Sequence, residues 1–103
     1  MSETTFIAVA RIDEVPQGTV KPVEAGGRAI LLCHDDRIHA IENRCSHAEQ
    51  PLDCGRMRRG WISCPMHGAR FDLATGEALK GPAVEPIDTF PVRIVGDTIE
   101  VCV

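Results

Sequence analysis

Short apolar runs alternate with turn residues along most of this chain, and no long stretch shows the spacing of an amphipathic helix. Runs rich in Val, Ile and Thr that are bounded by Gly, Pro and Asp are typical of β-strands. Gly96-Asp97, between two such runs, is a strong two-residue hairpin signal. The pattern predicts an all-β protein with strands at residues 5–11, 19–23, 29–33, 38–41, 92–95 and 98–101.

The middle of the chain, about residues 43–76, carries a second set of shorter runs. We expect one strand over residues 57–63, a returning strand over residues 69–72 and a closing turn over residues 74–77. Trp61 is expected to pack in the core beneath this unit. Residues 1–103 are predicted to form a single domain, with a base made of residues 1–42 and 77–103 and an inserted subdomain of about residues 43–76.

A chain of 103 residues provides the material of one domain. Its five cysteines are an odd number, which argues against a disulfide framework. No stretch approaches the roughly 20 apolar residues of a membrane span. The residues that follow Met1 lack the basic and apolar regions of a signal peptide. We therefore expect a cytoplasmic protein without a membrane partner.

The net charge of −4 is unevenly distributed. Between Arg44 and Arg70 there are five arginines and two acidic residues, a local charge of +3, so the remainder of the chain carries −7. Such a dipole can orient a protein on an acidic partner, but solvated arginines without a docking role would look the same in sequence. Nucleic-acid binding is a poor fit, because the chain is acidic overall and lacks a basic stripe interleaved with aromatic residues.

A Cys/His pair occurs twice, as Cys45 with His47 and, after sixteen residues, as Cys64 with His67. Residues two apart on an extended loop can point the same way, and Pro65 inside the second pair is typical of a tight turn. Two thiolates and two imidazoles suit a structural zinc ion. They equally suit a Rieske [2Fe–2S] centre, in which two histidines replace two cysteines on one iron. Zinc fingers usually group Cys with Cys and His with His, so the mixed pairs favour the iron–sulfur centre.

The longer runs around these pairs, residues 45–48 and 64–72, resemble Rieske ferredoxins, and the resemblance covers nearly the whole chain. It implies the Rieske fold, an antiparallel β-sandwich base with a small inserted β cluster-binding subdomain that carries two ligand loops. It also implies that Cys45 and Cys64 hold the buried iron of one [2Fe–2S] cluster, and that His47 and His67 hold the outer iron. Residues 81–83 are expected either to limit access of water to the cluster, as in the family, or to be an ordinary connector.

The resemblance also separates this chain from the high-potential branch of the family, found in cytochrome bc complexes. That branch joins its two ligand loops by a disulfide, and the matching positions here are Gln50 and Met66. It also has a Ser and a Tyr that donate hydrogen bonds to the cluster sulfurs, where this chain has Ala69 and Phe71, which cannot donate. Hydrogen bonds to sulfur stabilise the reduced cluster. We therefore predict a midpoint potential near the low end of the Rieske range of about −150 to +300 mV.

Together with the resemblance, these features predict a soluble, monomeric one-electron carrier with no catalytic residues of its own. The resemblance implies that it takes electrons from an NAD(P)H-dependent flavoprotein reductase and passes them to a terminal Rieske non-haem iron oxygenase in aromatic hydrocarbon degradation. The interfaces are expected to be small and transient. A chain of this length has no room for the 2-His-1-carboxylate domain of a catalytic oxygenase. The alternatives are the small subunit of an assimilatory nitrite reductase and a zinc-bound interaction module.

The remaining histidines and cysteines are expected to lie outside the centre. His34 and His39 flank a predicted hairpin and should be exposed. Cys33 and Cys102 are expected to be small apolar fillers or spectator thiols. Cys54 lies in a predicted turn and is the candidate for oxidation.

Overall fold

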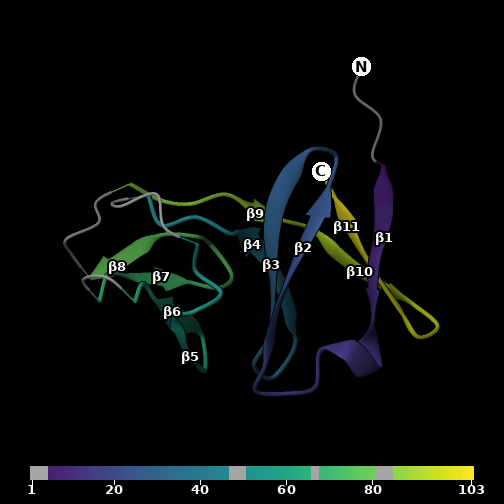
Figure 1. Cartoon of the computed structure of the whole chain (residues 1–103), viewed down its shortest axis with the longest axis horizontal. Coiled ribbons are helices and arrows are strands. Elements are labelled where there is room, and N and C mark those ends of the chain that lie inside the picture. Colours follow the sequence, from purple (N-terminus) through teal and green to yellow (C-terminus); the bar gives the residue numbers. More distant parts are fainter. Residues whose placement is uncertain (1–4, 47–50, 66–67, 81–84) are drawn as a thin grey trace.

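A computed structural model describes residues 5–46, 51–65, 68–80 and 85–103 of the chain. These residues form antiparallel strands and one short 3₁₀ helix, Ile12–Glu14, so the prediction of an all-β protein is confirmed. No helix in the described ranges has the length and apolarity needed to cross a membrane. The strands form three sheets, which follow one another along the longest axis of the molecule, horizontal in Figure 1.

The first two sheets contain every strand predicted near the two ends of the chain, with bounds shifted by at most two residues. Strand β9 (Thr89–Phe90) and the 3₁₀ helix were not predicted. Gly96, in the predicted hairpin between residues 92–95 and 98–102, has φ +62°, a conformation that favours glycine. The first sheet has the order β1 (Phe6–Arg11), β11 (Thr98–Cys102), β10 (Val92–Val95), and the second has the order β2 (Val20–Ala25), β3 (Arg28–His34), β4 (Ile38–Glu42), β9 (Thr89–Phe90).

Strand β3 lies in the middle layer, between two hydrophobic cores. Ile30 and Leu32 point into the core shared with the first sheet, and Leu31 and Cys33 into the core shared with the third. All four side chains are fully buried. Successive side chains of a strand point to opposite faces, so a strand covered on both faces must be apolar throughout. This explains the unbroken apolar run in the sequence.

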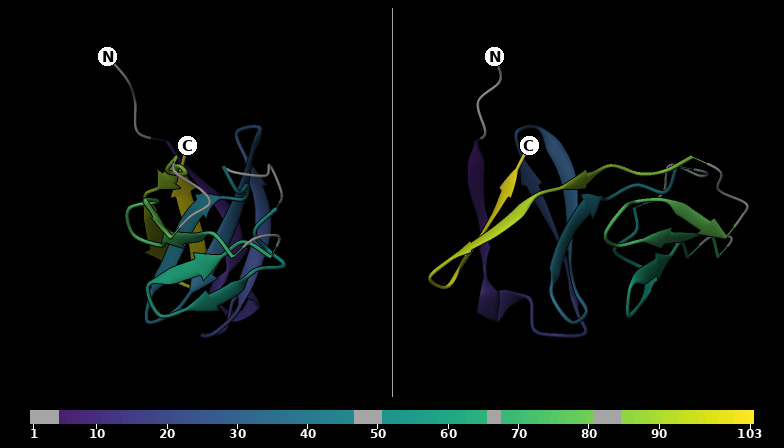
Figure 2. Two further views of the ribbon diagram at one scale, coloured as in Figure 1. Left: turned by 90° about the vertical axis from the view of Figure 1, so that its left-hand side faces the viewer. Right: turned by 180° about the vertical axis from the view of Figure 1, so that it is seen from behind.

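The third sheet has the order β5 (Arg56–Arg58), β6 (Trp61–Ser63), β7 (Arg70–Asp72), β8 (Ala78–Lys80), and it faces the viewer in the left panel of Figure 2. The prediction of one strand over residues 57–63 is wrong. The chain turns at Arg59-Gly60 and forms the β5–β6 hairpin, with Gly60 at φ +88°. Strand β8 was not predicted, because its three residues are too few to show a period.

Trp61 is only half-buried, so the expectation that it packs in the core is wrong. Its ring stacks beneath the guanidinium of Arg70, whose Cζ lies 4.2 Å from the ring centroid. The core position on each strand is taken by the neighbouring residues Ile62 and Phe71, which pair across β6 and β7 and are fully buried. The alternation of a strand decided which of Trp61 and Ile62 faces inward.

Candidate metal centre

Cys45 lies three residues beyond the end of β4 and is fully buried. The segment around it is fixed by side-chain hydrogen bonds to the backbone. Asn43 Oδ1 accepts a hydrogen bond from the backbone N–H of Leu52 at 2.8 Å, and Ser46 Oγ donates to the carbonyl oxygen of Glu85 at 2.7 Å. The first bond closes the loop on itself, and the second holds it against the segment that leads to β9.

Cys64 follows directly after β6 and is 2% exposed. Its backbone N–H donates to the carbonyl of Ala69 at 2.7 Å, and its own carbonyl accepts from the N–H of Gly68 at 3.1 Å. Gly68 has φ +75°, which favours glycine. These bonds close a tight turn, as the sequence predicts, and they fix the Cys64 backbone at the mouth of the β6–β7 hairpin.

The two cysteines belong to one buried core, which they share with Leu52, Ala69 and Phe71 among others. All five cysteines of the chain lie in the described ranges, and none forms a disulfide. Paired sulfur donors in an apolar environment fit iron or zinc ligation. His47 and His67 lie outside the described residues, so the structure brings together two of the four predicted ligands and leaves the histidines as a prediction.

Ala69 and Phe71 are fully buried in the same core as the two cysteines. Neither side chain carries a hydroxyl group, so neither can donate a hydrogen bond to a sulfur in this core. Gln50, Met66 and residues 81–83, which also entered the sequence prediction, lie outside the described residues.

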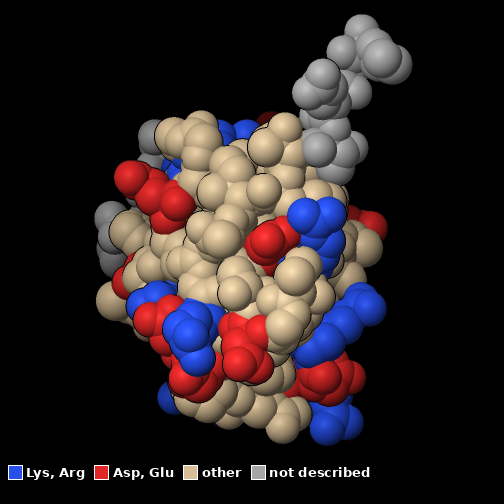
Figure 3. All heavy atoms as spheres, turned by 90° about the vertical axis from the view of Figure 1, so that its right-hand side faces the viewer, with Lys and Arg blue, Asp and Glu red and all other residues tan. Residues whose placement is uncertain are grey.

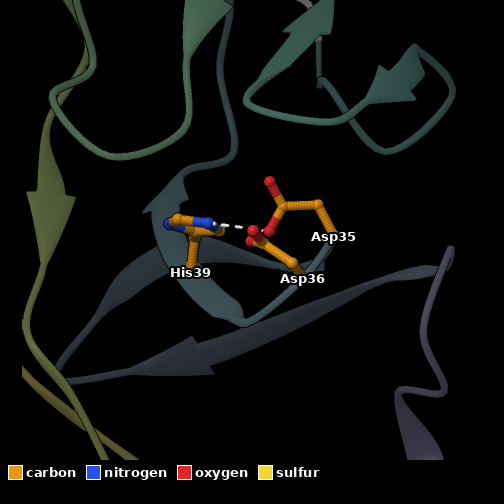
Figure 4. Close-up of side chains that lie close together, drawn as sticks. All are labelled: Asp35, Asp36 and His39. Atoms are coloured by element: carbon orange, nitrogen blue, oxygen red, sulfur yellow. Dashed lines mark hydrogen bonds and ion pairs between the residues drawn. The ribbon is translucent and has the colours of Figure 1, made fainter.

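A buried carboxylate links the second sheet to the third. Asp35, in the β3–β4 turn, is 8% exposed and accepts hydrogen bonds from the backbone N–H groups of Arg37 at 3.2 Å and Gly60 at 2.8 Å. His39 Nε2 lies 2.9 Å from the same carboxylate (Figure 4). Burial raises the pKa of Asp35, but the hydrogen bonds and the histidine outweigh burial and lower the pKa to about 2.

The histidines of this hairpin are not exposed, and the sequence expectation is wrong. The side chain of His39 is only 10% exposed, and the half-buried His34 has its Nδ1 2.7 Å from the carbonyl oxygen of Val15. Asp36 lies beside this group, so its carboxylate, Asp35 and His39 offer potential ligand atoms within 4.8 Å of one another (Figure 4). Because both oxygens of Asp35 already accept hydrogen bonds from the protein, we interpret the group as a structural link.

Little in the local sequence pattern indicates this link. Asp35 lies in a predicted polar turn, where aspartate usually bonds its own backbone. Its bond to the N–H of Gly60, 25 residues away, depends on the packing of two sheets. A polar residue next to the continuous apolar run of β3 was the only available signal.

The other cysteines differ in their surroundings. Burial, and secondarily the charge of Asp35, raises the pKa of the Cys33 thiol to about 12, so it stays protonated at neutral pH. Cys102 is half-buried. Cys54 is exposed, which is consistent with its being the residue most open to oxidation.

An open groove of about 640 Å³ lies on the base, away from the two predicted cysteine ligands. It is lined by apolar residues of β4, β9 and β10, such as Ile38, Phe90 and Ile94, and by Leu73 of the third layer. Cys45 and Cys64 do not line it, so the groove is not part of the candidate metal centre.

Comparisons with known proteins identify the family to which this fold belongs. The model of the Rieske [2Fe-2S] domain family matches residues 5–91. The chain is 37% identical over 90 residues to the ferredoxin component of the naphthalene 1,2-dioxygenase/salicylate 5-hydroxylase systems of a Ralstonia species, with 86% of each chain covered.

Solved structures show the same fold. The ferredoxin of carbazole 1,9a-dioxygenase from Nocardioides aromaticivorans IC177 has a TM-score of 0.89 and 35% identity, covering 94% of this chain and 96% of that one. A chain in the complex of reduced oxygenase and oxidised ferredoxin of carbazole 1,9a-dioxygenase has a TM-score of 0.87 and 25% identity, covering 94% and 92%. These similarities confirm the expected Rieske fold. The chain therefore belongs to the Rieske [2Fe-2S] domain family.

Proposed function

We propose that this protein is a one-electron carrier that connects a flavoprotein reductase with a terminal Rieske non-haem iron oxygenase in aromatic hydrocarbon breakdown. The observation that carries the proposal is the pair of buried cysteines, Cys45 and Cys64, that two separate loops bring into one core. They lie in a Rieske domain that resembles ferredoxin components over most of its length. The protein is an electron-transfer component and not a catalyst.

The proposed cofactor is one [2Fe–2S] cluster held by Cys45, His47, Cys64 and His67. Bound there, the cluster supplies a store for one electron. The apolar residues around the two cysteines exclude water from the sulfur side of the site. The assignment of the two histidines rests on the sequence motif. We further propose that about residues 43–76 form the cluster-binding subdomain and that residues 1–42 and 77–103 form the base of a single domain. Strand β8 lies beyond residue 76 but pairs with β7, so the third sheet extends past this proposed boundary.

A low midpoint potential is part of the proposal. Ala69 and Phe71 are buried in the same core as the two cysteines, and neither offers a hydroxyl group. A cluster without these donors gains less stabilisation of its reduced form, so its potential is lower. A carrier with a low potential can still pass its electron to another low-potential Rieske centre.

The partners and the compartment are also proposals. The solved complex of an oxygenase with a ferredoxin in carbazole 1,9a-dioxygenase supports an oxygenase as the acceptor. The flavoprotein reductase as donor, the monomeric state and the cytoplasmic location rest on the sequence. Five described cysteines without a disulfide fit a reducing compartment.

The decisive experiment is a redox titration of the purified protein, followed by EPR and visible absorption. We expect a Rieske-type EPR signal and a midpoint near the low end of the family range, well below about +100 mV. Phe71→Tyr and Ala69→Ser should each raise the midpoint without loss of the signal, because each restores a donor.

Three outcomes would contradict parts of this proposal. A Rieske signal at high potential would remove the assignment of the partners but keep the cluster. A cluster that still assembles in both the His47→Ala and the His67→Ala variants would contradict the assignment of these histidines as ligands. A colourless, EPR-silent protein that holds stoichiometric zinc would remove electron transfer altogether.

A further inference from the structure

The outer face of the third sheet gathers cationic side chains around one tryptophan. The inner row of this sheet, Met57, Ile62 and Phe71, packs against or forms the core. Because successive side chains alternate between faces, the residues on either side of that row point outward. The register aligns them in two rows across β5, β6 and β7: Arg56, Ser63 and Arg70 in one, and Arg58, Trp61 and Asp72 in the other.

The arginines of this outer face are available to a partner. Arg56 and Arg58, and Arg59 in the adjoining turn, are exposed. Within the described part of the chain, none of the three forms an ion pair. Arg70 is half-buried, and its guanidinium lies over the Trp61 ring. The two outward rows therefore carry three arginines, Arg56, Arg58 and Arg70, against the single carboxylate of Asp72, and Arg59 adds a further positive charge in the turn.

Several arginines of the base are paired instead. Arg28 lies 2.7 Å from Asp88, and Arg93 lies 2.7 Å from Glu100. On the side of the base that faces away from the third sheet, Lys and Arg side chains lie next to Asp and Glu side chains (Figure 3). Pairing cancels most of their field at a distance. The unpaired positive charge of the outer face stands out more because the chain as a whole carries −4.

The position of the outer face relates it to the candidate centre. Ser63 is the last residue of β6 and Cys64 follows it, while Arg70 is the first residue of β7. The row of Arg56, Ser63 and Arg70 is therefore the row closest to the Cys64 turn. A protein seated on this face also approaches the end of the sheet where the cluster would be bound, as electron transfer requires.

We propose that the outer face of β5–β7, with Arg56, Arg58, Trp61 and Arg70 at its centre, is the surface on which an acidic region of a protein electron-transfer partner docks. The proposal rests on the proposed function. Arginine suits this role because its planar guanidinium binds carboxylates through two parallel hydrogen bonds. Trp61 supplies a half-buried apolar surface among the charges, as is common at the centre of an interface.

The first test uses a short poly-L-glutamate peptide as an acidic probe. Trp61 is the only tryptophan of the chain, so its fluorescence reports on this face alone. We expect saturable binding of the peptide at low salt, and an affinity that falls about ten-fold or more as added salt rises to 0.2 M. Arg56→Glu/Arg58→Glu should abolish binding.

The matched control is Arg11→Glu/Arg93→Glu, which changes the net charge equally at exposed positions of the first sheet. It should bind the peptide like the wild type. Equal loss of binding in both double variants would show a response to net charge only and overturn the proposal. No binding by the wild type would contradict the proposal. The arginines of the edge strand β5 would then serve to prevent aggregation through edge-to-edge strand pairing. Tighter binding of poly-uridylate, or self-association at low salt that the first variant abolishes, would assign the face to RNA or to a second copy instead.

The second test uses the holoprotein and hexacyanoferrate(III), a trianion that takes one electron from the reduced cluster and becomes hexacyanoferrate(II). The net charge of −4 predicts repulsion, so the rate constant should rise with salt. Docking on the outer face predicts the opposite, a fall of about ten-fold. Arg56→Glu/Arg58→Glu should reverse the sign of the salt effect and leave the EPR signal unchanged. A rate that rises with salt in the wild type contradicts the docking surface, whereas a missing EPR signal contradicts the proposed function.

Discussion

The base and the third sheet are both antiparallel, but they are held together in different ways. In the base, β1, β2, β3, β4 and β11 are five to seven residues long, and their core contains only aliphatic residues at its buried positions. In the third sheet every strand has three residues, and the buried core includes Cys45 and Cys64.

This difference shows where each region obtains its stability. Long strands make many ladder hydrogen bonds and bury continuous apolar area, so the base needs little else. Three-residue strands make few ladder hydrogen bonds and bury little apolar area. The third sheet is fixed instead by the apolar face of β3 and β4 behind it, by Asp35 holding Gly60, by Asn43 holding Leu52 and by the proposed metal ligands. We infer that the third sheet depends on these links more than the base does.

Removing the iron should have the largest effect and should confine it to one region. Binding of a metal to a site that the unfolded chain lacks contributes directly to folding stability. After chelation under reducing conditions, we expect hydrogen exchange to accelerate by orders of magnitude in β5–β8 and to stay slow in β3 and β11. Cys45→Ser should reproduce this result, and Cys102→Ser should not. Equal acceleration in both regions would show that the two are one cooperative unit.

Truncating one large core residue in each region should sharpen the comparison. Phe71 and Leu32 are both fully buried, one in each core. Phe71→Ala should cost about 3–5 kcal/mol and Leu32→Ala about 2–5 kcal/mol, because each leaves a cavity. We expect the first change to release exchange only in β5–β8 and the second to release it throughout the chain. Chemical denaturation with hydrogen exchange distinguishes the two, and global release by Phe71→Ala would contradict the comparison.

Asp35→Asn tests the link between the regions and should have the smallest effect of the three. An amide has one oxygen, so one of the two backbone donors, on Arg37 or Gly60, loses its partner, at about 1–3 kcal/mol. The folded pKa is lowered from 3.8 to about 2. The stabilisation that the ionised Asp35 carboxylate contributes is therefore fully present above its ordinary pKa of 3.8. It is lost as pH falls through the folded pKa of about 2.

The measurement is the urea midpoint of wild type and variant between pH 7 and pH 2, followed by Trp61 fluorescence. The gap between the two proteins should be constant down to about pH 4 and then close, because the protonated carboxyl resembles the amide. Asp36→Asn is a suitable control, since Asp36 is exposed and next to Asp35 in the chain. A gap that persists unchanged at pH 2 would show that the charge of Asp35 contributes nothing to the link.

Much of the fold could be predicted from local pattern. All four candidate ligands were also predicted in this way, but the two histidines lie outside the described residues and stay a prediction. Six of the seven strands described in the first two sheets follow from runs of apolar residues and the turns between them, and Gly96 adopts the conformation that its hairpin needs. The β5–β6 hairpin was missed because Arg59-Gly60 interrupts a run that otherwise looks like one strand. Histidine burial was missed because the partner of His39 is a carboxylate that looked like an ordinary turn residue.

The sequence by itself determined the positions of six strands of the first two sheets and the two Cys/His pairs with their spacing, because these depend on residues close together in the chain. Only the tertiary structure decided that Cys45 and Cys64 enter one core and that β3 is covered on both faces. It also decided that Asp35 reaches Gly60, and that the arginines of β5 share a face with Trp61 and Arg70. Each of these depends on how separate segments pack and register against one another, which no local pattern specifies.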